Sequence, residues 1–308
     1  MNLLLLLLLI LTIGCSFQSR EKSIVFEEKK VKEATLILNP ESSHEIGAPS
    51  EIKAVPGGFL VYDYGVEKIF KLDHDGNKLL SFGNSGRGPG EFQDIFGLWE
   101  IDEEYWVYDY NSAKYIIYDH EGKWIKDLAL NFDEFPKYPV RVEVIMPYQF
   151  VVPSGGKDGS LFKLVDMEAQ NIQYLGGALG AYMYTRDSEE AHQAISAGRI
   201  PADMQNAIML SSNQTGVFLF QQTTAILEKY SHAGELLWQK SVKVPAIEGL
   251  FEHLFRENRR RINRGEFLLT FNYGKRISAN RDGVAVLLNV PEEEPVTVAW
   301  VSNSGEDL

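Results

Sequence analysis

Residues 59–83 read FLVYDYGVEKIFKLDHDGNKLLSFG, and residues 105–128 read YWVYDYNSAKYIIYDHEGKWIKDL. Both stretches contain Val-Tyr-Asp-Tyr, an apolar strand, an Asp-His-acid-Gly turn and another strand, in the same order. Gly76 and Gly122 of the two turns lie 46 residues apart. An internal repeat of this period, with about four short strands in each unit, is typical of a propeller blade. The repeat therefore predicts an all-β propeller with four-stranded antiparallel blades.

Three further turn residues extend the repeat along the chain. The segments around Ala169, Gly234 and Gly305 each follow an apolar strand of the same kind. The first three turn marks are one period apart, whereas the last two intervals are clearly longer. Insertions are therefore expected near 177–205 and 245–266, and helices only within them. The sequence thus contains five recognisable blade units.

The units contain short strands with alternating apolar and polar residues, separated by turn residues. In the first unit the predicted strands are 51–55, 59–63, 68–72 and 78–82. The fifth unit has three, at 276–280, 283–289 and 296–301. One more strand, 34–38, precedes the first unit. Because a ring must hide its sheet edges, this strand is expected to complete the final blade. The alternative is a chain that stops before its last blade is finished.

Length and composition indicate the class of protein. The circular repeat favours a single propeller domain over residues 34–308 of this 308-residue chain. Hydrophobic residues make up 44% of the sequence, which is enough for a sizeable core. The net charge of −13 argues against nucleic acid as a partner, because a basic surface supplies most of the affinity of nucleic-acid-binding proteins.

The N-terminus has the features of an export signal. Residues 3–13 form an apolar run that is too short to span a bilayer and has the length of a signal-peptide core. Cys15, the only cysteine, follows at a position that resembles the lipobox of bacterial lipoproteins. We therefore predict a signal peptide over 1–14, lipidation of Cys15 and a polar tether over 15–33. An ordinary cleaved signal peptide is the alternative. The lipid would anchor the chain to a membrane of the bacterial envelope, with the outer membrane favoured.

A glycine-rich segment carries a family resemblance. Residues 87–92 read RGPGEF, and Val107, Asp109, Asn111 and Gly122 follow. This pattern resembles the NHL repeat, in which G-P-G-E/Q-F leads into a strand, a V-x-D-x-x-N turn and an apolar strand ending in D-x-x-G. Together with the lipobox, the sequence resembles the six-bladed β-propeller lipoproteins of the Bacteroidetes. The resemblance implies six blades, one more than the units counted above.

The connections between blades are the expected ligand-binding face. Residues 83–90 lack the Gly-Lys-Ser/Thr ending of a phosphate loop and are interpreted as a crossover between blades. The crossovers share one face of the ring with the second loop of each blade. An Asp that precedes such a loop commonly accepts backbone N–H bonds, although it could also face a ligand. The candidate residues on this face are Asp63, Lys68, Arg87, Glu91, Asp109 and Lys114.

No metal or catalytic site is predicted. His74, His120 and His232 occupy the same turn in different blades, which places them too far apart to share a metal ion. The chain has no G-x-S-x-G, no H-E-x-x-H and no second cysteine.

The expected function is that of a membrane-anchored, non-catalytic binding or scaffold lipoprotein. It is expected to be a monomer without a cofactor, and to present a propeller face to an envelope peptide, glycan or protein. The alternative is a metal-assisted hydrolase or lyase with a site in the central channel, where Ca²⁺ would be the metal.

A basic amphipathic helix is predicted over residues 246–264. Its apolar positions follow the helical spacing and are Ile247, Leu250, Phe251, Leu254 and Phe255. Its other face carries a basic patch of Arg256, Arg259, Arg260, Arg261 and Arg264. The patch is expected to contact an acidic partner, an anionic lipid headgroup or acidic loops of the protein itself. A second helix is expected over 188–197.

Overall fold

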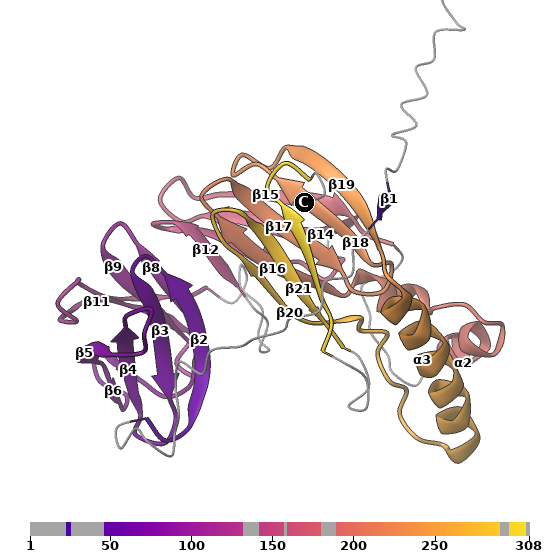
Figure 1. Cartoon of the computed structure of the whole chain (residues 1–308), viewed down its shortest axis with the longest axis horizontal. Coiled ribbons are helices and arrows are strands. Elements are labelled where there is room, and N and C mark those ends of the chain that lie inside the picture. The colour runs from indigo at the N-terminus through magenta and orange to yellow at the C-terminus, as the bar shows by residue number, and fades with distance from the viewer. Residues whose placement is uncertain are drawn as a thin grey trace, which may run out of the picture.

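The computed structural model describes residues 23–25, 46–131, 142–156, 159–179, 189–289 and 296–305. In these ranges the chain folds as a β-propeller, as the repeat predicted (Figure 1). Blade 1 consists of β2 (Pro49–Val55), β3 (Gly58–Asp63), β4 (Lys68–Leu72) and β5 (Lys78–Phe82). Blade 2 consists of β8 (Ile95–Ile101), β9 (Glu104–Asp109), β10 (Lys114–Tyr118) and β11 (Trp124–Ala129).

The next three blades follow in chain order. Blade 3 consists of β12 (Glu143–Met146), β13 (Gln149–Pro153), β14 (Ser160–Asp166) and β15 (Asn171–Gly177). Blade 4 consists of β16 (Ile208–Asn213), β17 (Gly216–Gln221), β18 (Ile226–Tyr230) and β19 (Leu236–Lys243). Blade 5 has three described strands, β20 (Gly274–Ala279), β21 (Gly283–Leu288) and β22 (Val298–Ser302). Neighbouring strands within each of these blades are antiparallel, and the first strand of each blade lies innermost, where it contacts the first strand of the next.

The strand expected to complete the final blade, 34–38, lies outside the described residues, as do Cys15 and most of the predicted tether. Three residues of that tether segment form β1 (Ser23–Val25), which pairs in parallel with β19 and adds a fifth strand to blade 4. Between two innermost strands, Arg276 of β20 forms an ion pair with Glu51 of β2, with Nη2 and Oε1 3.4 Å apart. This pair joins the last described blade to the first.

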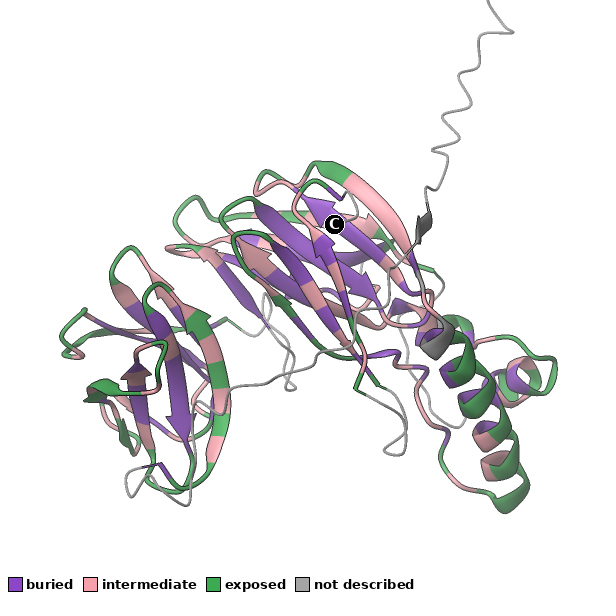
Figure 2. Cartoon of the chain, viewed as in Figure 1, coloured by how far each residue is buried: buried purple, intermediate pink, exposed green. Residues whose placement is uncertain are grey.

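Each blade is stabilised by packing its two faces against its neighbours. The second strands are therefore buried on both faces: in β9, every residue from Tyr105 to Asp109 is buried. The aromatic side chains supply much of this contact. Phe82 of blade 1 stacks on Tyr105 of blade 2, with ring centroids 4.8 Å apart. Trp106 of blade 2 meets Tyr148 of blade 3 edge-on at 5.5 Å. In blade 2 the outermost strand, β11, is the most exposed, and its residues are exposed or intermediate (Figure 2).

The connections of the propeller differ strongly between its two faces. On one face lie the short hairpins inside each blade, such as 56–57, 102–103 and 214–215. On the other lie the second loops and the connections from each outer strand to the next inner strand. Of these connections, 83–94 and 244–273 are described in full, and 130–142 and 178–207 only in part. We call this the crossover face. The last two crossovers contain the predicted insertions, with α2 (Glu189–Ser196), the 3₁₀ turn η2 (Ala202–Asn206) and α3 (Pro245–Arg264).

Candidate functional site

Asp63 is a structural acceptor within blade 1. Its carboxylate is fully buried, and Oδ2 accepts the backbone N–H groups of Gly47 and Ala48, at 2.7 and 2.8 Å. The other carboxylate oxygen accepts the N–H groups of Gly65 and Val66 in the second loop, at 2.8 and 3.1 Å. The carboxylate therefore joins the entry of the blade to its second loop.

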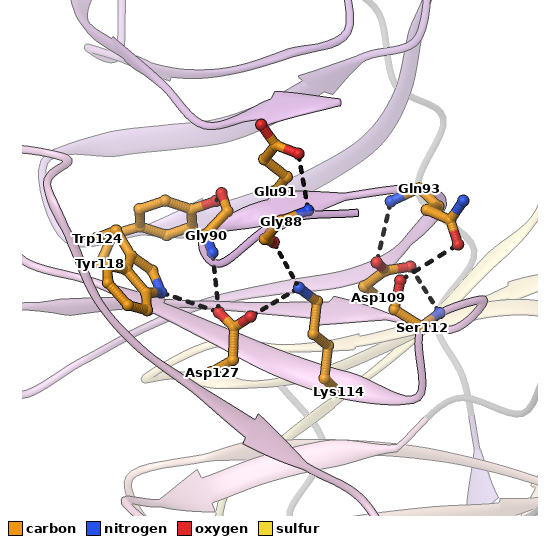
Figure 3. Close-up of polar contacts among 10 residues, drawn as sticks. All are labelled: Gly88, Gly90, Glu91, Gln93, Asp109, Ser112, Lys114, Tyr118, Trp124 and Asp127. Carbon is orange, nitrogen blue, oxygen red and sulfur yellow. Dashed lines mark hydrogen bonds and ion pairs between the residues drawn. The ribbon is translucent and has the colours of Figure 1, made fainter. Parts of the chain in front are cut away.

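Asp109 has the same role in blade 2. It is also fully buried and accepts the N–H groups of Gln93 at 2.9 Å and of Ser112 at 3.4 Å (Figure 3). It accepts the N–H group of Asp94 at 3.1 Å as well. Burial, followed by the nearby charge of Asp109, raises the pKa of the Asp94 carboxyl. Both aspartates thus hold loops in place, which is the structural alternative that the sequence left open.

Lys114 and Asp127 anchor the glycine-rich crossover to blade 2 (Figure 3). Lys114 Nζ donates to the carbonyl of Gly88 at 3.3 Å and lies 2.7 Å from Asp127 Oδ2. Asp127 Oδ1 accepts from Gly90 N–H at 3.1 Å and from the Trp124 indole at 2.9 Å. A Cβ on Gly90 would lie 2.7 Å from Trp124, and its φ of +72° also favours glycine. The segment is therefore a structural crossover, as expected.

Glu91 and Lys68 hold the same crossover from its two ends. Glu91 Oε2 accepts Gly88 N–H at 2.8 Å, which closes the turn (Figure 3). Lys68 Nζ donates to the carbonyl of Gly83 at 2.9 Å and to the Asn84 side chain. Five of the six predicted face residues are thus occupied by contacts within the protein.

Arg87 is the exception among the predicted face residues. It is exposed at the tip of this crossover, and no hydrogen bond or ion pair joins it to a described residue. Two apolar side chains of the second loop in blade 1 are also exposed on this face: Tyr64 is 65% and Val66 is 44% accessible. Sequence reasoning missed both, although they directly follow the Val-Tyr-Asp motif that identified the loop.

A polar cluster on the ring axis was not predicted either. Glu143 of β12 is buried with its side chain 2% exposed, and its Oε2 lies near donors from three other inner strands. These donors are Lys53 Nζ of β2 at 3.4 Å, Trp99 Nε1 of β8 at 3.3 Å and Ser212 Oγ of β16 at 3.4 Å. One carboxylate therefore connects four blades. The sequence signal is a charged residue within an otherwise apolar inner strand.

The arginine patch divides into residues that contact the protein and residues that do not. Arg261 donates to the carbonyl of Phe267 at 3.2 Å and lies near Glu257 and Glu266. Arg259 is exposed and has no hydrogen bond or ion pair with a described residue. Its Nη2 lies 3.8 Å from the place of a Cβ on Gly198, which follows α2.

The other three arginines are exposed as well. Arg260 and Arg264 each have one long ion pair, with Glu257 at 3.6 Å and Glu266 at 3.8 Å. Arg256 is exposed and has no ion pair with a described residue. The expected contact with the protein's own acidic groups therefore holds for part of the patch only.

The described residues contain neither a cluster of metal-ligating side chains nor a helix that could span a membrane. Among them, no group of three or more His, Cys, Asp or Glu side chains could hold a metal ion. His74, His120 and His232 lie in separate turns opposite the crossover face. Neither α2 nor α3 has the length and apolar composition needed to cross a membrane.

Comparison with known proteins agrees with the fold. The model of the family DUF5128, described as a 6-bladed beta-propeller, matches residues 30–176, which extend from ahead of β2 to the end of blade 3. No curated protein matches the sequence significantly.

Solved structures resemble this chain at low sequence identity. A protein of Bacteroides fragilis whose name calls it exported has a TM-score of 0.52 at 12% identity, covering 84% of this chain and 69% of that one. A member of the duf4221 family from Bacteroides vulgatus has a TM-score of 0.44 at 10% identity, covering 83% of this chain and 93% of that one. Virginiamycin B lyase from Staphylococcus aureus has a TM-score of 0.43 at 10% identity, covering 84% and 68%. Likenesses at this level of identity concern the fold and not the chemistry.

Proposed function

We propose that this protein is an exported, lipid-anchored binding or scaffold protein that holds a peptide, glycan or protein partner on its crossover face without catalysing a reaction. One observation carries the proposal. The described parts of the crossovers, which include α2 and α3, add their residues to a single face, whereas the opposite face consists of short hairpins among the described strands. Propeller loops are the part of this fold that can vary without disturbing the packing between blades.

The part of the crossover face formed by blades 1 and 2 is also held by specific hydrogen bonds. Asp63 and Asp109 fix the second loops of blades 1 and 2, and Lys114 fixes the crossover between those blades. A partner that docks here would meet Tyr64 and Arg87 already positioned, so less conformational entropy is lost on binding. Such preorganisation supports a binding function.

Site-specific crosslinking tests this proposal. A photo-crosslinking amino acid placed at Tyr64 is expected to form adducts in intact cells, whereas the same group at His74 is not. Both positions are exposed in blade 1, but they lie on opposite faces. Adducts are separated by mass and identified by peptide sequencing. Equal crosslinking at the two positions, or none at Tyr64, would overturn the proposal.

The location is proposed from the N-terminal sequence, which lies outside the described residues. An apolar run that ends at the only cysteine supports lipidation, and the name of the Bacteroides fragilis neighbour is consistent with export. Cys15→Ala is expected to abolish labelling by a palmitate analogue and to release the chain from membranes. Because the substitution leaves the propeller sequence intact, the released protein should show an unchanged melting temperature. Unaltered membrane association in the variant would contradict lipidation.

A further inference from the structure

α3 presents a narrow row of arginines on the crossover face. Arg256, Arg260 and Arg264 are spaced four residues apart and are all exposed; the side chains of the last two are 61% and 63% accessible. Successive members of such a row are separated by about 6 Å along the helix axis. The row is unusual in this chain, whose net charge is −13.

The helix that carries the row is firmly attached through its other side. Asn258 is fully buried and makes two hydrogen bonds with the backbone of Leu269, donating at 3.0 Å and accepting at 2.7 Å. Phe255 packs against Phe271, with ring centroids 4.7 Å apart. These contacts fix the rotation of α3 about its axis, so the arginine row keeps one direction.

The row contributes little to the stability of the helix itself. Like charges four residues apart repel each other by a few tenths of a kcal/mol, and the ion pairs of Arg260 and Arg264 are long and exposed. In contrast, Arg261 binds the Phe267 carbonyl. Arg259 is exposed beside Gly198, about a quarter of a turn around the helix from Arg260. A hydrogen bond to the backbone thus accounts for Arg261, but not for the row of Arg256, Arg260 and Arg264.

We propose that the row of Arg256, Arg260 and Arg264 binds an extended acidic segment of a partner protein. Alternate side chains of an extended strand lie about 6.6 Å apart on one side, which is close to the spacing of the row. Carboxylates at alternate positions can therefore each meet one guanidinium, and arginine binds carboxylates with two parallel hydrogen bonds. A row, unlike a broad patch, suits a linear ligand. The inference rests on the proposed function, because α3 lies on the crossover face.

The test uses two labelled peptides of identical composition, both made of Glu and Ser. In one, Glu alternates with Ser; in the other, all Glu residues are contiguous. Fluorescence anisotropy is expected to show tighter binding of the alternating peptide to the mature protein. Arg260→Gln/Arg264→Gln should weaken that binding by about tenfold, and raising the salt concentration should weaken it in the wild type.

Lys123→Gln/Arg281→Gln is the matched control. These two cations are exposed, each has one ion pair with a neighbouring acid, and both lie opposite the crossover face. The control variant should bind the alternating peptide like the wild type. Equal weakening by both variants, or equal binding of the two peptides, would overturn the proposal.

Two further measurements test other possible ligands of the arginine row. Binding of the wild type to vesicles containing phosphatidylglycerol, without preference between the peptides, would assign the row to a lipid surface. Self-association in sedimentation that Arg260→Gln/Arg264→Gln abolishes would assign it to a second copy of the chain. Either result overturns the acidic-segment proposal. If the arginine row shows no preference for the alternating peptide while Tyr64 still forms crosslinked adducts, the proposed function stands and only the role of α3 is wrong.

Discussion

Replacing Asp63 by alanine is expected to lower the free energy of unfolding by about 3–5 kcal/mol. The buried carboxylate accepts four backbone N–H groups, from Gly47, Ala48, Gly65 and Val66. Hydrogen bonds to a charged group contribute about 1.5–3 kcal/mol each. Water can reach part of the donors that remain, so the total is smaller than four full bonds. Urea denaturation followed by tryptophan fluorescence measures the change.

Asp75→Ala provides the control for this substitution. Asp75 lies in the third turn of the same blade, where its side chain is exposed, and its loss is expected to change stability by less than about 0.5 kcal/mol. Hydrogen exchange adds a local readout. In Asp63→Ala the amides of Gly65 and Val66 should exchange faster, whereas amides in blade 4 keep their protection until global unfolding. An unchanged urea midpoint would show that the carboxylate does not stabilise the blade.

The repeat made the fold predictable, because each blade is defined by local sequence. The predicted strands 68–72 and 78–82 coincide with β4 and β5, and β2 begins two residues before the predicted 51–55. The helix predicted over 246–264 agrees with α3 to within one residue. Turn residues and apolar alternation are local signals, and they survive in every unit. Ring closure is different, since it depends on residues far apart in the chain.

The roles of the predicted face residues could not be read from local sequence for the same reason. Asp63 and Asp109 occur in an identical motif, and the sequence allowed either backbone acceptors or ligand contacts. Their decisive donors, Gly47 and Gln93, lie 16 residues earlier in the chain. Lys114 likewise reaches Gly88 in the preceding crossover. A motif identifies the loop, but only the ring shows which side chains its neighbours already use.

The polar cluster around Glu143 is even harder to predict from the sequence than the roles of the face residues. Lys53 and Glu143 are 90 residues apart, and Ser212 is 69 residues further along. The local sequence around each of these residues does not indicate that the three inner strands meet. Glu143 is 2% exposed and lies near three donors. We therefore expect the cluster to couple the stabilities of the blades that it joins.

Glu143→Leu is expected to lower the free energy of unfolding by about 3 kcal/mol, because it leaves Lys53 and the Trp99 indole without their shared acceptor. Lys53→Met should cost less, about 1–2 kcal/mol, since Glu143 keeps the other two donors. The double variant replaces the ion pair by two apolar side chains. Its loss should be smaller than the sum of the single losses, with a coupling of about 1–2 kcal/mol. Urea denaturation of the four proteins measures this cycle.

A second cycle distinguishes the axis from an ordinary ion pair between blades. Lys71 and Glu100 also join blades 1 and 2, at the shorter distance of 2.9 Å, but both side chains are partly exposed. Lys71→Met and Glu100→Leu should therefore couple by less than about 1 kcal/mol.

Loss of Glu143 should in addition reduce the dependence of the unfolding free energy on urea, because blades 1 and 2 would begin to unfold separately from blades 3 to 5. Additive effects of Lys53→Met and Glu143→Leu, within about 0.5 kcal/mol, would mean that the axial carboxylate does not couple the blades and that interblade packing alone maintains the ring.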